Sequence, residues 1–527
     1  MIPDGRAPAS RAVSPRVPPA RTASSASAWV LLSSVLASGM VFIDGTALSV
    51  ALPVLQRELH ATGAGLFWVT NGFSLPLAAL LLFGGVLGDT FGRRRIFSLG
   101  IAIFTVASVG CGLAPDIGVL IAARVAQGVG GALMVPGSLA LLSSHFPPEV
   151  RGKAIGTWSA FSVLATTIGP VLGGVLAGAG LWRVVFFINV PLAAVALLAV
   201  LSRVPPDPAA SRRAVDGWGA LLLTLGLAGL NQGLIEWPKA GLGHPLVSIP
   251  LAGGLVALGA FLHRQTRVAH PLLPLDVFRS PSLLAACGLS FAFYLGFHGT
   301  LFFMPLNLVQ VQGYAPMLAG LTQLPLMALL ILLSRWAGRC VDRRGPRLPL
   351  TFGPLFAAAG FLLFALPGLT AGPREFWTTY LPGFVLVGVG LGLTATPLST
   401  AVMDAVPSDR LGLASGINSS TTRLAGVFAI AVLGPVMLAV FSRALEARVA
   451  DLGLTDTALA VLRLEAAKLA VARPPEGLAP ATAQAVEAAI REAFVAGFRV
   501  VVSLAAACCV GAALLATLLR GRPATGH

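Results

Sequence analysis

Two side chains of opposite charge lie inside long apolar stretches of the sequence, where an ionisable group is costly and is therefore a functional candidate. Asp44 lies within the stretch 29–53, and Arg124 lies within the stretch 117–142. If both stretches are membrane-crossing helices, a rise of about 1.5 Å per residue puts Asp44 about 22 Å outward from Trp29 and Arg124 about 10 Å below the outer edge. In a hydrocarbon core about 30 Å thick, both side chains then lie in the outer half.

From this shared depth we predict that Asp44 and Arg124 form a pair or a water-linked network. An adjacent arginine lowers the pKa of a carboxyl group and burial raises it, so a change in their separation would switch the proton affinity of Asp44. In that interpretation Asp44 takes up and releases a proton while Arg124 tunes its pKa. The alternative is a static buried pair that only fixes helix packing.

Two further ionisable candidates lie in the second part of the chain. His298 lies in the outer half of the stretch 282–305, and an unperturbed histidine titrates near 6.5, so it is a candidate for proton coupling. It could instead donate a hydrogen bond between helices or line a cavity. Arg423 lies about eleven residues into the stretch 412–440, near the midplane, where it contacts either an anionic partner or the bundle interior.

The composition explains why these charges stand out. Of 527 residues, 56% are hydrophobic and only 11% are charged, against roughly 25% charged in a typical soluble domain. This excludes an ordinary soluble enzyme, a disordered chain and a fibrous repeat. The net charge of +15 is spread over short loops, which indicates membrane orientation rather than nucleic-acid binding. The five cysteines lack metal-ligand spacing, and we predict neither a metal nor a cofactor.

The elements that must position these side chains are apolar helices, each about 20 residues long. The sequence predicts an all-α polytopic membrane protein with fourteen transmembrane helices, at 29–53, 66–88, 95–113, 117–142, 154–178, 184–201, 216–236, 246–263, 282–305, 319–338, 348–367, 380–400, 412–440 and 494–519.

An even number of spans puts both termini on one side, and the distribution of basic residues decides which. With the termini inside, the inner segments hold most of the 36 Lys and Arg residues, whereas the short outer loops hold only Arg57, Arg183, Lys239 and Arg374. The positive-inside rule therefore predicts cytoplasmic termini, with a disordered segment 1–28 and a tail 520–527. We expect the loop 441–493 to lie outside and to form one or two short surface helices.

The two ends of the chain repeat each other. Gly85–Arg95 returns as Gly338–Arg347, and at nearly the same offset Asp44-Gly-Thr returns as His298-Gly-Thr and Gln56 returns as Gln310. Such repeats are typical of transporter folds. They predict a six-helix half at 29–201, a linker and two inserted helices at 202–263, and a second half at 264–519. We expect the inserted helices to lie outside the bundle and to line no transport path, with Asn231, Gln232 and Glu236 at the membrane interface.

The motifs resemble those of the major facilitator superfamily and, within it, the fourteen-span drug:proton antiporters of the EmrB/QacA-like group. The resemblance rests on five segments, of which the first carries Ser49 where that group usually has asparagine: Phe42–Pro53, Gly85–Arg95, Arg124–Gly131, Gly169–Gly174 and Trp182–Pro191. It implies two six-helix halves plus two inserted helices, and export by alternating access.

The resemblance also implies roles for two further groups of residues, and composition suggests a third group. A conformational latch at the inner end of the second span, which the superfamily pattern brings to the start of the thirteenth near 409–416, comprises Gly85, Asp89, Gly92, Arg93 and Asp342. A close-packed antiporter seam that seals one gate comprises Gly169, Pro170, Gly173 and Gly174. The candidates for the cavity, chosen by composition, are Trp68, Asn71, Phe73, Phe293, Tyr294, Phe297, Asn307, Gln323 and Arg423.

The function that these features favour is proton-coupled export of lipophilic or cationic small molecules from the cytoplasm. The chain has no P-loop pattern, so ATP is not the expected energy source. We expect a monomer in a bacterial cytoplasmic membrane whose partners are protons, a small-molecule substrate and lipid, not nucleic acid. A dedicated exporter of one metabolite or lipid is the first alternative. A membrane-embedded enzyme or a non-transporting scaffold is the alternative from a different class.

Overall fold

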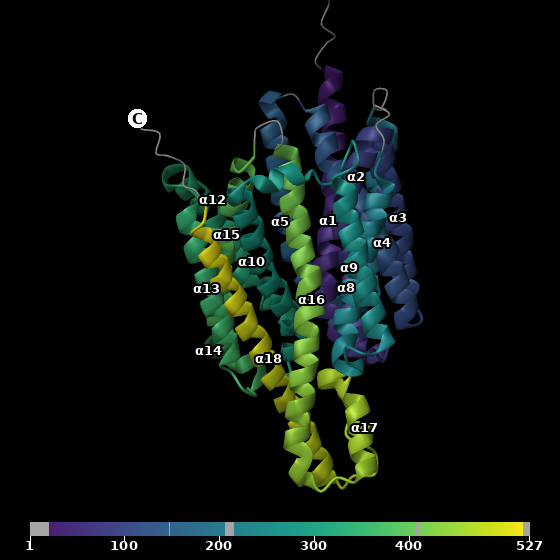
Figure 1. Ribbon diagram of the computed structural model, residues 1–527, viewed down its shortest axis with the longest axis vertical. Coiled ribbons are helices and arrows are strands. Elements are labelled where there is room, and N and C mark those ends of the chain that lie inside the picture. Colours follow the sequence, from purple (N-terminus) through teal and green to yellow (C-terminus); the bar gives the residue numbers. More distant parts are fainter. Residues whose placement is uncertain (1–20, 147, 206–214, 407–410, 520–527) are drawn as a thin grey trace, which may run out of the picture.

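The computed structural model describes residues 21–146, 148–205, 215–406 and 411–519, and every regular element in these ranges is helical. Fourteen helices of the described chain are long and apolar enough to cross a membrane, which confirms the predicted fold class. Figure 1 shows them as one elongated bundle. We call the end at which the described chain begins and finishes the terminal end, and the opposite end, beyond which α17 (Asp456–Ala466) projects, the cap end.

The first half holds six spans, the last of which is interrupted at Ile188. Its helices are α1 (Arg21–Glu58), α2 (Gly63–Phe91), α3 (Arg93–Leu113), α4 (Ile117–His145), α5 (Pro148–Gly178), α6 (Val184–Phe187) and α7 (Asn189–Arg203). The inserted pair follows as α8 (Gly217–Ala240) and α9 (Pro245–Gln265), and η1 (Leu275–Arg279) leads into the second half.

The second half also holds six spans. Its elements are α10 (Pro281–Leu306), η2 (Asn307–Val311), α11 (Pro316–Leu321), α12 (Leu324–Arg344), α13 (Arg347–Ala365), η3 (Gly372–Glu375), α14 (Phe376–Thr379), α15 (Leu381–Asp404), α16 (Leu411–Val449), η5 (Ala450–Leu452), α17 (Asp456–Ala466), η6 (Leu469–Val471) and α18 (Pro480–Ala516).

Helix starts fall where a polar side chain can accept from the otherwise unpaired backbone N–H groups. Thr62 accepts from Gly65 N at the start of α2, and Asp116 accepts from Val119 N at 2.9 Å at the start of α4. Within the spans, the helix satisfies its own backbone, which a lipid environment requires. Short polar turns between apolar runs therefore determine the boundaries of the spans.

The two halves use the same helix pairs. In the first half α2 and α3 both pack on α4, and α1 packs on α5 and α7; in the second half α12 and α13 both pack on α15, and α10 packs on α16 and α18. This correspondence is the one that the sequence repeat predicts.

The apolar cores show how the halves meet. One buried cluster runs from the second half into the cap-end part of the first and includes Leu55, Leu66 and Phe67. Residues of the first half nearer the terminal end, among them Phe97 and Leu141, form a separate cluster. The halves therefore share a continuous core at the cap end.

Two predictions for segments outside the spans need correction. The segment 1–28 was expected to be disordered, but α1 begins at Arg21 as a continuation of the first span; residues 1–20 lie outside the described chain, as does the tail 520–527. In the loop 441–493, α17 is one short helix, as predicted, whereas much of the remaining loop is a direct extension of α16 and α18 beyond the bundle (Figure 1).

The inserted helices do not stand apart from the bundle. α8 packs against both α2 and α16, which belong to different halves. Asn231 of α8 is buried and accepts from Asn71 Nδ2 at 2.8 Å, so its placement at the membrane interface was wrong.

Asp216 caps the start of α8 at the terminal end. Burial raises the pKa of its carboxyl group, but hydrogen bonds from Arg264, Gly219 N and Gln265 outweigh this effect and hold the pKa below its usual value.

Helices α1 and α5 approach so closely that only glycine fits at one point. A Cβ built at Gly173 would lie 2.0 Å from the carbonyl oxygen of Ala47, which is backbone and cannot move away alone. The absence of a side chain there sets the spacing of the two helices.

We predict that Gly173→Ala lowers the midpoint of thermal unfolding in detergent, because forcing a methyl group into this contact costs about 1–3 kcal/mol. Gly156→Ala in the same helix is the control, since a Cβ there meets nothing within 4 Å. Equal midpoints for the two variants would contradict this role for Gly173.

Candidate functional site

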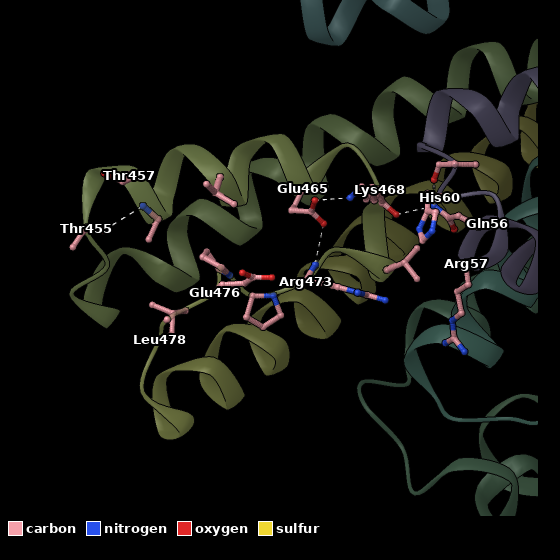
Figure 2. A pocket seen from close by; sticks show the side chains of 17 residues that line it. Gln56, Arg57, His60, Thr455, Thr457, Glu465, Lys468, Arg473, Glu476 and Leu478 are labelled. Atoms are coloured by element: carbon pink, nitrogen blue, oxygen red, sulfur yellow. Dashed lines mark hydrogen bonds and ion pairs between the residues drawn. The ribbon is translucent and has the colours of Figure 1, made fainter. Parts of the chain in front are cut away.

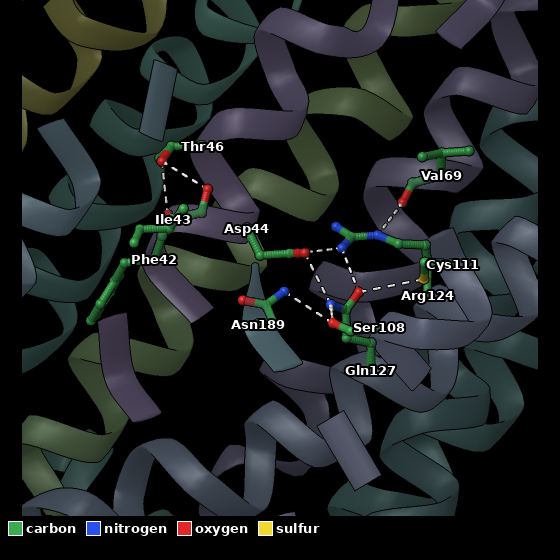
Figure 3. A network of polar contacts seen from close by, with 10 residues as sticks. All are labelled: Phe42, Ile43, Asp44, Thr46, Val69, Ser108, Cys111, Arg124, Gln127 and Asn189. Atoms are coloured by element: carbon green, nitrogen blue, oxygen red, sulfur yellow. Dashed lines mark hydrogen bonds and ion pairs between the residues drawn. The ribbon is translucent and has the colours of Figure 1, made fainter. Parts of the chain in front are cut away.

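The charged pair predicted from depth exists in the structure. Arg124 of α4 donates from Nη1 to Asp44 of α1, and the exposed fractions of the two residues are 1% and 0%. Figure 3 shows the two side chains pointing toward each other between the helices. An ion pair removed from water in this way is tolerated only when its remaining hydrogen-bonding capacity is filled.

Neighbouring polar side chains fill that capacity. Gln127 lies one turn after Arg124, donates from Nε2 to the second oxygen of Asp44 at 2.9 Å and accepts from Arg124 Nη1 at 2.7 Å. Gln127 also donates to Ser108 of α3, which accepts from Asn189 of α7 at 3.0 Å. The network therefore joins α1, α3, α4 and α7, and both oxygens of Asp44 have a donor (Figure 3).

The guanidinium group has further contacts that hold it in place. Its Nε donates to the backbone oxygen of Val69 at 3.2 Å, and its central carbon lies 4.3 Å from the ring centroid of Phe73. The arginine thus keeps a hydrogen bond and a cation–π contact that do not depend on Asp44. If Asp44 gains a proton, Arg124 does not lose all its partners.

The network includes members that sequence reasoning did not assign to the site. Gln127 is three residues from Arg124, a spacing that puts both on one helix face, so its participation was readable from the sequence. Asn189 lies within the motif Trp182–Pro191, but the motif does not predict that it joins this site. Ser108 carries no sequence signal, because an isolated serine in an apolar helix has the same pattern whether or not it meets a partner.

The structure describes the side chains of only some of the predicted latch residues. Asp89 at the terminal end of α2 is bonded to Arg93, whose Nε donates to it at 2.9 Å. Gly92 has a φ of 102°, which favours glycine at this turn between α2 and α3. Residues 407–410 and the side chain of Asp342 lie outside the described parts of the chain, so the contact with the start of the thirteenth span stays a prediction.

Two of the four predicted seam residues, Pro170 and Gly174, lie where the halves meet. A Cβ built at Gly174 of α5 would lie 2.5 Å from the backbone oxygen of Pro316 in the other half, and a Cβ at Gly320 of α11 would lie 2.3 Å from that of Pro170. The approach is therefore reciprocal. Gly169 and Gly173 instead face α1 of their own half, where Thr46 and Ala47 are the nearest neighbours.

A pair of repeat-related glutamines connects the halves at the cap end. Gln310 Nε2 donates to Gln56 Oε1 at 2.9 Å, and the two residues occupy equivalent places in the two repeats. Gln56 in turn donates to the backbone oxygen of Lys468 at 2.9 Å, and Gly63 N donates to that of Ala467 at 2.8 Å. The loop between α17 and η6 thereby holds the first half as well as the second.

A cavity of about 720 Å³ lies beside this contact, outside the spans. Figure 2 shows Gln56 and Arg57 at the end of α1, with His60 just after it, on one side and the segment around α17 on the other. It shares no residue with the Asp44 network, so it is not the chamber in which proton and substrate sites would meet.

The cavity candidates fall into separate environments. Phe73 is buried and lies against the guanidinium group of Arg124. Phe293 and Phe297 stack on each other, and Phe297 faces a small apolar void inside the second half. Asn307 donates to the hydroxyl of Tyr380. Each of these side chains packs within its own half of the molecule, where it completes an interface between helices. Sequence composition could not distinguish such positions from a cavity wall.

Other candidates lie closer to the junction of the halves. Trp68 donates to Gln232 of α8, and Asn71 donates to the backbone oxygen of Val427 in α16 as well as to Asn231. Gln323 is buried at the start of α12. Figure 1 gives the positions of these helices in the bundle.

His298 is half-buried on α10, its ring stacked on Tyr294 at 5.8 Å between centroids. Gly426 of α16 packs against this ring, since a Cβ built there would lie 3.3 Å from His298 Cδ2. Arg423, one turn earlier on α16, is also half-buried. Among the described residues it makes no ion pair and no hydrogen bond, in contrast with Arg124.

Known proteins with this arrangement of helices are numerous. The sequence model of the Major Facilitator Superfamily matches residues 34–430. The chain is also 34% identical over 417 residues to the multidrug resistance protein Stp of Mycobacterium tuberculosis, a match that covers 79% of this chain and 77% of that protein. The chain belongs to the Major Facilitator Superfamily.

Its relatives place it in the drug-efflux group of that superfamily. It is 34% identical over 502 residues to the tetracenomycin C resistance and export protein of Streptomyces glaucescens, covering 93% of this chain and 91% of that one. The resemblance seen in the motifs is confirmed. A crystal structure of a bacterial homologue of the human lysosomal transporter Spinster shares the fold, with a TM-score of 0.60, 22% identity, and coverage of 95% and 99% of the two chains.

We predict that Arg124→Gln lowers the midpoint of thermal unfolding in detergent, since removing one partner of a buried pair costs about 3–5 kcal/mol. The double variant Asp44→Asn/Arg124→Gln should recover part of the loss, because no uncompensated carboxylate remains. A double variant no more stable than Arg124→Gln alone would show that the pair itself does not determine this stability.

Proposed function

We propose that this superfamily member is a proton-coupled exporter of lipophilic small molecules that resides in a bacterial cytoplasmic membrane with both termini in the cytoplasm. The relatives named for drug resistance and export support the direction of transport. The positive-inside distribution of Lys and Arg supports the orientation, which makes the cap end the outer end. On this orientation the described conformation is closed to the outside, where the halves share a core.

The observation that carries the proposal is the buried Asp44–Arg124 pair. Asp44 is the one carboxylate of the described residues that lies in the middle of a span, and it is held by two donors. A proton can reach it only after the helices around it separate, and protonation removes its attraction for Arg124. Proton binding and helix rearrangement are then a single coupled event, which is the requirement for a proton-driven transporter.

The contacts across the halves supply the element that must open. Rocking of one half against the other would break the Gln56–Gln310 hydrogen bond and separate Gly174 from Pro316. An inward proton flux under the membrane potential supplies about 2.3 kcal/mol per charge for each 100 mV. The chain acts as a monomer in this scheme, since each half provides the surface against which the other moves.

Export of a single metabolite or lipid by the same mechanism is the alternative. A panel of antibiotics and dyes tested in an efflux-deficient bacterial host separates the two functions: resistance to several unrelated compounds supports drug efflux, and resistance to one supports a dedicated exporter. A scaffold or an enzyme would give no gradient-driven efflux at all.

We predict that Asp44→Asn abolishes gradient-driven efflux in everted membrane vesicles without lowering the amount of protein in the membrane, because asparagine cannot exchange a proton. Asp116→Asn is the matched control: Asp116 is an exposed helix N-cap, and asparagine caps equally well. Full efflux by Asp44→Asn with an unchanged pH dependence would remove Asp44 from the mechanism.

We also predict that linking positions 56 and 310 stops transport reversibly. In a cysteine-free background, Gln56→Cys/Gln310→Cys is treated with a short bifunctional methanethiosulfonate and then reduced. Transport should stop on linking and return on reduction, because the cap-end junction can no longer open. The control is the double variant Gln56→Cys/Gln312→Cys, because Gln312 donates to the backbone oxygen of Gly368 in its own half and not to Gln56. Transport that continues in fully linked protein would refute this gate.

A further inference from the structure

The second half carries a cation in the membrane interior whose partner is missing from the described chain. Arg423 makes no hydrogen bond and no ion pair with any described residue, although a guanidinium group has five donors. Asp44 is already engaged by Arg124 and Gln127 and has no free oxygen to offer. An unpaired charge at this depth is expensive unless something else satisfies it.

The face of α16 that carries Arg423 points toward the other half. Arg423 is seven residues from Gly416, four from Val427 and eleven from Gly434, spacings that return to one side of a helix. All three of those residues contact α2: Gly416 adjoins Leu82, Val427 accepts from Asn71, and Gly434 adjoins Phe67. The guanidinium group therefore lies on the strip that faces the junction of the halves rather than lipid.

Two ring systems on α10 border this strip. Gly426, three residues after Arg423, packs on the ring of His298, and His298 stacks on Tyr294 with an angle of 28° between the planes. No hydrogen bond links the Tyr294 hydroxyl or the His298 ring nitrogens to any described residue. All three side chains are half-buried, so each keeps accessible surface. They present donors and flat rings together, and no carboxylate of the described residues bonds to any of the three.

We propose that Arg423, Tyr294 and His298 form the substrate-recognition site of the exporter, and that its substrates are aromatic molecules carrying an acidic oxygen, such as an ionised phenol or a carboxylate. Arg423 forms the charge-assisted bond to that oxygen, and the two rings of α10 stack against the aromatic system. Permanent cations are disfavoured, because they would meet an arginine and no available carboxylate. This proposal rests on the proposed export function, and it replaces the cationic substrates that the sequence analysis expected with anionic ones.

The arrangement also divides the two tasks between the halves. The carboxylate that would carry the proton lies in the first half, and the cation that would hold the substrate lies in the second. Asp44 and Arg423 can therefore be tested separately, since neither side chain contacts the other's partners.

The test uses two xanthene dyes of similar size and opposite charge at neutral pH, fluorescein and rhodamine 123. Binding to the purified protein in detergent is measured by fluorescence anisotropy, without a gradient, and uptake is measured in energised everted vesicles. We expect fluorescein to bind more tightly than rhodamine 123. Arg423→Gln should weaken fluorescein binding by about tenfold or more, as expected for the loss of a charge-assisted bond, and Arg423→Lys should weaken it less.

Three controls keep the result specific. Arg443→Gln removes the same charge from an exposed position on the same helix and should leave fluorescein binding unchanged. Tyr294→Leu should weaken binding of fluorescein through lost stacking, whereas Tyr294→Phe should retain most of it. Thermal unfolding in detergent shows that each variant is folded before its binding is compared.

The outcomes separate this proposal from the export function. Asp44→Asn should lose fluorescein uptake but keep fluorescein binding. Fluorescein binding that depends on Arg423, without uptake by any variant, would refute export and support the site. Uptake of rhodamine 123 alone, unchanged in Arg423→Gln, would support export and overturn the site. Absence of fluorescein binding to the unmodified protein, or equal loss in Arg423→Gln and Arg443→Gln, would also overturn it.

Discussion

The cost of burying a charge in a membrane protein is the constraint on which the first half depends. Asp44 and Arg124 are removed from water almost completely, so their attraction offsets the loss of hydration only if every remaining donor and acceptor is used. Gln127 supplies the missing bonds to both partners, and Ser108 accepts in turn from Gln127 and from Asn189. For this reason the bonds that start at one carboxylate join four helices.

The second constraint is backbone proximity between elements that must also separate. Glycine at positions 174 and 320 lets α5 and α11 meet at backbone distance across the halves, which gives a tight seal with few side chains to disentangle. The polar contacts at the same end, from Gln56 to Gln310 and to the loop after α17, are few and neutral. Such an interface closes firmly but opens without the cost of separating buried charges.

Much of the fold was readable from the sequence, because length and polarity alone decide whether a helix spans a bilayer. The fourteen spans, the repeat and the family all follow from local composition and motif spacing. The inserted pair illustrates the limit. Its lack of a repeat partner suggested an isolated position, yet Asn231 is buried against Asn71, since an amide in a span gains more from a partner than from a distant interface. Sequence polarity indicates that a partner is needed, not where it lies.

By itself the sequence determined which residues are ionisable at membrane depth and, through the rise of a helix, that Asp44 and Arg124 share a level. It could not determine which way each side chain faces, because rotation of a helix about its axis leaves depth unchanged. Tertiary packing decided that Ser108 and Asn189 join the network, that Phe73 and Asn307 serve their own halves, and that Arg423 has no hydrogen bond or ion pair with any described residue. Those outcomes depend on the neighbours across each interface, and neighbours distant in the chain leave no local pattern.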